Sequence, residues 1–159
     1  INTAIMRKYW LYTAIIGFSL LIASCNSADK NVGKIASDYC DCLRKLDKSM
    51  SSETKKIISN AANSDNPSKS IQKDVMAMDE EKQLQIGKEM VSVGDMEDES
   101  SEIGRCIKRI EKKYDNAYTM NEEKFLKKLV KELEGDPGCG LTASLLKLGL
   151  KMKDKPGFE

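Results

Sequence analysis

The stretch VGKIASDYCDCLRKLDKSM, residues 32–50, decides the fold of this chain. Its apolar side chains recur at steps of three and four residues: Val32, Ile35, Ala36, Tyr39, Leu43, Leu46 and Met50. Side chains at this spacing share one face of an α-helix, whereas a half-buried strand alternates at every second residue. The stretch therefore predicts an amphipathic helix with one face against a core.

The sequence after this stretch has the same helical character, because aromatic residues are sparse and Lys, Glu, Met, Leu and Ala dominate. Residues 51–66 are compatible with a short helix or a loop. Further helices are expected over residues 67–91, 99–118 and 141–152. A bend or a new helix is expected at the capping-box pattern of residues 119–122. The chain is thus predicted to be mainly helical.

The helix predicted over residues 67–91 has a clear start, because Asn66 is a good N-cap and Pro67 suits the first helical position. It is expected to bury Ile71, Val75, Met78 and Ile86, and to end at Gly94-Asp95.

The amino-terminal residues read as an export signal. Arg7 and Lys8 follow Met6, and an uncharged run of 16 residues comes next, Tyr9 to Ser24. This run is shorter than the roughly 20 residues that a helix needs to cross a bilayer. Residues 6–24 are therefore predicted to be a cleaved signal peptide rather than a transmembrane anchor.

Ile22-Ala23-Ser24-Cys25 resembles the lipobox of bacterial lipoproteins. The resemblance implies that Cys25 receives acyl chains, palmitate among them, and becomes the mature amino terminus, with residues 25–31 as a tether. An ordinary secretory signal with an incidental cysteine is the alternative.

The helix of residues 32–50 also faintly resembles small lipoproteins of Bacteroidota. With Asn26 next to Cys25 and only Asp29 acidic nearby, the resemblance implies an envelope protein on the periplasmic face of the outer membrane.

Composition narrows the classes of function. The mature chain would have 135 residues, which favours one domain, and 24 basic against 25 acidic residues, which speaks against nucleic acid as a partner. The chain has no histidine, so imidazole catalysis and histidine-containing metal sites are excluded. No cofactor or metal site is expected, and no enzyme activity.

Four cysteines remain besides Cys25: Cys40, Cys42, Cys106 and Cys139. An even number in a small exported domain predicts disulfides. If Val32 lies at 0° on the helix, Cys40 lies at about 80° and Cys42 at about 280°, on opposite sides of the apolar stripe. The two cannot easily reach each other, so each should pair with Cys106 or Cys139. Both pairings remain open, with a slight preference for Cys40 with Cys106.

The predicted fold class is therefore all-α, a small bundle of four or five helices stapled by two disulfides. The helical domain is expected to span residues 32–152, followed by a flexible tail, residues 153–159.

Two classes of function fit these observations. The first is a non-enzymatic binding or assembly module, such as an inhibitor, an immunity protein or a complex subunit, with the membrane and an envelope protein as partners. The second is a thiol redox or metal-handling protein that uses Cys40 and Cys42.

The predicted last helix has apolar side chains on two sides. Leu141, Leu145, Leu148 and Met152 share one face, while Leu146 and Leu150 point elsewhere. Burial between neighbouring helices is the favoured interpretation of Leu146 and Leu150, and a contact patch for a partner or the bilayer is the alternative.

Overall fold

The computed structural model describes residues 28–114 and 122–153, and all regular secondary structure in this part of the chain is helical. The predicted all-α fold with two disulfides is confirmed. The elements are α2 (Ala28–Ser49), α3 (Ser52–Asn63), α4 (Pro67–Met76), α5 (Glu80–Gly94), α6 (Glu102–Tyr114), α7 (Glu122–Glu134), the 3₁₀ turn η2 (Pro137–Cys139) and α8 (Gly140–Lys153). The described helices outnumber the four or five expected, because residues 51–66 form a helix and because residues 67–91 form two helices instead of one.

Helix α2 contains all but the last residue of the quoted stretch, and the whole apolar stripe is buried, with Ile35 fully inaccessible and Met50, just after the helix, at 6% exposure. This part of the prediction is confirmed. The helix begins at Ala28, four residues before the predicted start, because its first turn continues without a break into the stripe.

Residues 51–66 were compatible with a helix or a loop, and in the structure most of them form the helix α3. The side chain of Ser51 accepts a hydrogen bond from the backbone N–H of Thr54, 3.2 Å away, and so caps the helix. Ile57, Ile58, Ala61 and Ala62 are buried. The polar Asn60 and Asn63 are on the exposed side, so they do not interrupt the helix.

The single helix predicted over residues 67–91 is wrong, because the structure divides it into α4 and α5. The expected N-cap is present, since Asn66 accepts a hydrogen bond from the N–H of Lys69. Asp79, however, caps a new helix by accepting from the N–H of Lys82, 2.9 Å away. Of the four residues expected in the core, only Ile86 is fully buried, and Ile71, Val75 and Met78 are half-buried. The break lets two short helices fold back against α3.

Helix α6 begins at Glu102 rather than at residue 99, because residues 95–101 form a tight turn before it. A Cβ atom at Gly104 would lie 2.1 Å from the carbonyl oxygen of Asp98, so only glycine allows this close approach. Residues 115–118 of the predicted helix, and residues 119–121 of the capping box, lie outside the described residues. A separate helix, α7, is described from Glu122.

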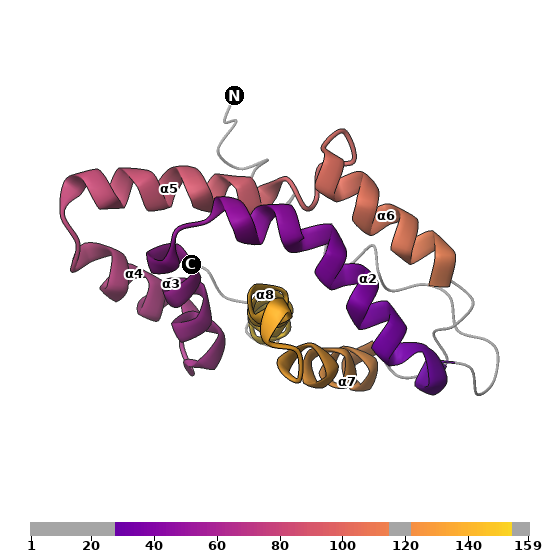
Figure 1. Cartoon of the computed structure of the whole chain (residues 1–159). Helices are drawn as coiled ribbons and strands as arrows, with labels where there is room; N and C mark the ends of the chain where they lie inside the picture. Colours follow the sequence, from indigo (N-terminus) through magenta and orange to yellow (C-terminus); the bar gives the residue numbers. More distant parts are fainter. Residues whose placement is uncertain (1–27, 115–121, 154–159) are drawn as a thin grey trace, which may run out of the picture.

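Helix α8 is the centre of the molecule and is seen nearly end-on between α2, α3 and α7 in Figure 1. Its side chains enter three apolar clusters: Ala143 and Leu146 pack with α2 and α7, Leu141 and Leu145 pack with the second half of α2, and Leu148 packs with α3. The molecule is thus built around its last helix. No helix within the two described ranges is both long enough and apolar enough to cross a bilayer.

Candidate functional site

The four cysteines form two disulfides, Cys40 with Cys139 and Cys42 with Cys106. The expectation that Cys40 and Cys42 bond to different elements is confirmed, and the slight preference for Cys40 with Cys106 is wrong. Cys42 fastens α2 to α6, and Cys40 fastens α2 to η2, the corner between α7 and α8.

The side of α2 on which each cysteine lies explains this connectivity. Cys42 shares a face with Asp38 and Lys45, within about 60° at 100° per residue. Asp38 pairs with Lys113 at 2.7 Å and Lys45 pairs with Glu102 at 2.6 Å, so α6 lies along this face in the opposite direction. Cys106 is the cysteine on α6. Cys40 is on the other side of the stripe and reaches Cys139 instead.

Asp38 forms the most connected polar contact between α2 and α6. Its Oδ2 atom accepts hydrogen bonds from Lys113 Nζ and from the Tyr114 hydroxyl, both at 2.7 Å. These two bonds, that of Lys113 first, hold the pKa of Asp38 below its ordinary value. Burial, and then the bond to Asp38, raises the pKa of Tyr114. The Lys113 ammonium also lies 4.9 Å from the centre of the Tyr114 ring. This cluster fixes the last turn of α6 against α2.

The outer face of α6 carries a charged surface groove of about 360 Å³, which we call the α6 groove. Six side chains line it: Glu99, Glu102, Arg105, Lys108, Arg109 and Lys112. The four cations are spaced i, i+3, i+4 and i+7, so they form one stripe along the helix, and all four are exposed. The surface is suited to binding an anion.

The cations of the α6 groove differ in how far they are neutralised. Arg105 donates to the carbonyl of Ser100, and Lys108 Nζ lies 3.2 Å from Glu99 and 3.8 Å from Glu111. The hydrogen bond with Glu99, together with the charges of Glu99 and Glu111, raises the pKa of Lys108. Arg109 and Lys112 form no ion pair or hydrogen bond with any described residue. Glu102 attracts Arg109 through its charge without forming an ion pair, so among the described residues the carboxyl-terminal half of the groove has net positive charge.

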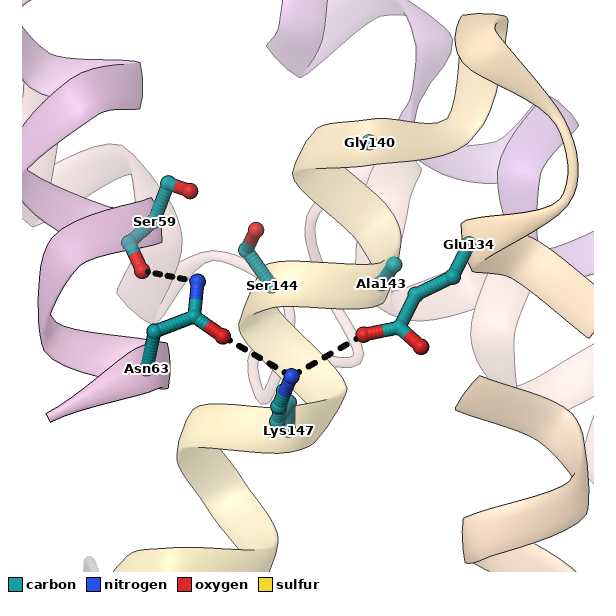
Figure 2. Close-up of a pocket in the computed structure, with 7 residues that line it drawn as sticks. All are labelled: Ser59, Asn63, Glu134, Gly140, Ala143, Ser144 and Lys147. Carbon is teal, nitrogen blue, oxygen red and sulfur yellow. Dashed lines mark hydrogen bonds and ion pairs between the residues drawn. The ribbon is translucent and has the colours of Figure 1, made fainter. Parts of the chain in front are cut away.

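A second hollow, of about 230 Å³, lies where α3, α7 and α8 meet (Figure 2). Lys147 occupies its centre and donates to Asn63 Oδ1 at 2.8 Å and to Glu134 Oε1 at 3.0 Å. Asn63 in turn donates to the carbonyl of Ser59 at 2.9 Å. The Lys147 ammonium thus donates to the Glu134 carboxylate and the Asn63 side-chain oxygen, and the Asn63 amide nitrogen donates to the Ser59 carbonyl. Because these polar groups bond to one another, the cluster joins three helices rather than offering an open binding group.

The other residues predicted as sites are placed as follows. Leu146 is partly buried against the first core cluster, and Leu150 is half-buried near the end of α8. Cys25 lies outside the described residues. No group of three or more potential metal ligands occurs among the residues whose positions are described.

Sequence reasoning missed both the α6 groove and the Lys147 cluster. The groove had a readable signal, because Arg105, Lys108, Arg109 and Lys112 follow helical spacing. The Lys147 cluster joins residues that are far apart in the chain, so no local pattern pointed to it. No protein-family model matches the chain, and no curated protein or solved structure does so either.

Proposed function

We propose that this chain is a lipid-anchored protein of the bacterial envelope, attached to the outer membrane on its periplasmic side, and that it acts as a non-enzymatic binding or assembly module. The observation that carries the proposal is the lipobox-like sequence Ile22-Ala23-Ser24-Cys25 after an uncharged run. Two or more acyl chains anchor a protein stably to a membrane, so a membrane-spanning helix is not needed.

The two disulfides support export to an oxidising compartment, where such bonds persist. The start of α2 supports a close attachment, because only Asn26 and Ser27 separate Cys25 from Ala28. Three steps of at most 3.8 Å give the connection a reach of about 11 Å. This is shorter than the tether of residues 25–31 that the sequence suggested.

A binding role is supported by the α6 groove, which has exposed charged side chains. A disulfide and an ion pair with α2 hold this helix in place. The alternative of a thiol redox or metal-handling protein gains no support from the positions of Cys40 and Cys42. Both are buried, and each is bonded to a cysteine far away in the chain. We therefore favour a structural role for all four sulfurs.

The anchor is tested by replacing its acceptor, Cys25→Ser. Because the thioether then cannot form, we expect the variant to lose labelling by radioactive palmitate and to remain an uncleaved precursor or leave the membrane fraction. Ser27→Ala, a change two residues away, should keep both label and membrane attachment. Label that fails to enter the native protein, or that persists in Cys25→Ser, contradicts the proposal.

The binding role is tested by chemical cross-linking in intact cells, followed by extraction in mild detergent. A module that binds or assembles should be recovered in a discrete, reproducible cross-linked species. Recovery of the protein only as an uncross-linked monomer, over a range of cross-linker lengths, contradicts this role.

A further inference from the structure

The charge of this molecule is unevenly distributed, although its total is near zero. Residues 64–102 contain eleven acidic and four basic side chains, whereas residues 105–113 contain five basic and one acidic. The acidic segment includes α4 and α5, which form an arm on the left in Figure 1, and the basic segment is most of α6, at the upper right. The net charge of the whole chain is therefore near zero because an acidic arm and a basic helix offset each other.

The basic helix ends beside Asp38, in the third turn of α2. Asp38 bonds to Lys113, Cys42 to Cys106, and Lys45 to Glu102, which fixes α2 and α6 side by side in opposite directions. The last turn of α6 thus lies at the same end of the molecule as the start of α2 (Figure 1). Under the proposed function, Ala28 is held within about 11 Å of the lipidated Cys25, and Asp38 lies about 15 Å further along the axis of α2.

The α6 groove changes sign along its length. Glu99 and Glu102 lie at its amino-terminal end, while Arg109 and Lys112, which have no ion-pair partner in the described residues, lie at its carboxyl-terminal end. The unpaired cations are therefore the ones nearest the anchor. Guanidinium groups bind phosphate oxygens through two parallel hydrogen bonds, and ammonium groups bind them as point charges.

We propose that Arg105, Lys108, Arg109 and Lys112 in the α6 groove bind the anionic phospholipid headgroups of the membrane to which the protein is anchored. This inference rests on the proposed function, because the anchor brings the groove to the bilayer. Basic side chains are attracted to an anionic membrane surface within about one Debye length, roughly 8 Å in physiological salt. The anchor and the groove together then orient the molecule, with the acidic α4–α5 arm directed away from the lipid.

The test is a labelling experiment on the full lipidated chain in vesicles of phosphatidylcholine alone or with about 30% phosphatidylglycerol. An amine-reactive reagent and mass spectrometry measure how fast each lysine is modified. We expect Lys108 and Lys112 to react at least about threefold more slowly in the anionic vesicles, and about 0.5 M salt to remove the difference. Lys82 and Lys88 on α5 should react equally in both vesicles.

Charge-reversed variants make the test specific. Arg105→Glu with Arg109→Glu should abolish the lipid-dependent protection of Lys112. Lys73→Glu with Lys88→Glu changes the net charge equally on the acidic arm and should leave that protection intact. Both pairs of positions are on exposed helix surface, so neither variant is expected to unfold the protein.

Two failures are distinguishable. If the native protein does not float with neutral vesicles, the anchor of the proposed function is absent. If it floats with both vesicles but Lys108 and Lys112 react equally in each, the headgroup inference is overturned. Protection in intact cells that neither vesicle reproduces also overturns it, because another macromolecule then covers the groove.

Discussion

Glu89 on α5 reaches across to the start of α3 and completes its cap. Its carboxylate accepts hydrogen bonds from the backbone N–H of Ser51 at 3.0 Å and from the Ser51 hydroxyl at 2.8 Å, and Gln85 donates to its other oxygen at 2.8 Å. Burial acts to raise the pKa of Glu89, but the hydrogen bonds with Thr54, Gln85 and Ser51 outweigh it and lower the pKa from 4.5 to about 2. One side chain therefore joins a helix start to a neighbouring helix.

We expect Glu89→Gln to lower the free energy of unfolding by about 1–2 kcal/mol at neutral pH, because charge-assisted bonds to the cap are lost. Since the pKa of the folded state is below that of the unfolded chain, the contribution is complete above pH 4.5 and is lost as the pH falls to about 2. Urea unfolding of both proteins between pH 6 and pH 2 should show the difference shrinking over this window. The control Glu81→Gln, on the exposed side of α5, should change stability little, and a difference that stays constant with pH contradicts the assignment.

At the scale of elements, the prediction from sequence succeeded where an apolar stripe continued over several helical turns. It failed where an N-cap residue determined where one helix ended and the next began. The stripe of α2 continues over five turns, so its core face was readable. The division between α4 and α5 depends on a single N-cap, Asp79, inside a stretch that keeps helical composition on both sides. The signal was present, because two acidic residues follow Asp79 in the first turn, but periodicity alone does not register it.

Helix α8 gives an element-scale prediction, because Leu146 is partly buried against the core while Leu84 on α5 is 62% exposed. Leu146→Asp should lower the free energy of unfolding by at least about 2 kcal/mol, since a charge enters an apolar environment. The same change at Leu84 should have little effect. Thermal melting distinguishes them. If Leu146→Asp melts like the native protein and loses a binding partner, the contact patch is the correct interpretation.

At the scale of the whole molecule, α6 is joined to the body mainly through α2. Three contacts along one face, at Asp38, Cys42 and Lys45, hold it there. An acidic residue precedes and a basic residue follows both Cys42 and Cys106 in the sequence, and this shared order brings opposite charges together when the two helices are antiparallel. The Lys147 cluster, in contrast, needs three helices to be packed before it exists.

Removing the Cys42–Cys106 disulfide by Cys42→Ser with Cys106→Ser should free α6 while the remaining helices stay folded. Hydrogen exchange should become faster over residues 102–114 and remain slow in α3 and α8. The loop-entropy model assigns about 4 kcal/mol to each disulfide. Cys40→Ser with Cys139→Ser should instead speed exchange in α7 and α8, which form the core with α2. Equal acceleration of all helices in the first variant would show that α6 is not a separable part.

The two disulfides are nested, because the bond from Cys40 to Cys139 encloses the one from Cys42 to Cys106. A chain that enters an oxidising compartment amino end first presents Cys40 and Cys42 together, while their partners follow only after 64 and 99 residues or so. Oxidation in order of arrival would join the two neighbours, and later Cys106 with Cys139, which is the one pairing that the folded helix forbids. If the protein is exported as we propose, any bond that forms between Cys40 and Cys42 before α2 folds must be exchanged for the two long-range bonds before the native structure is reached.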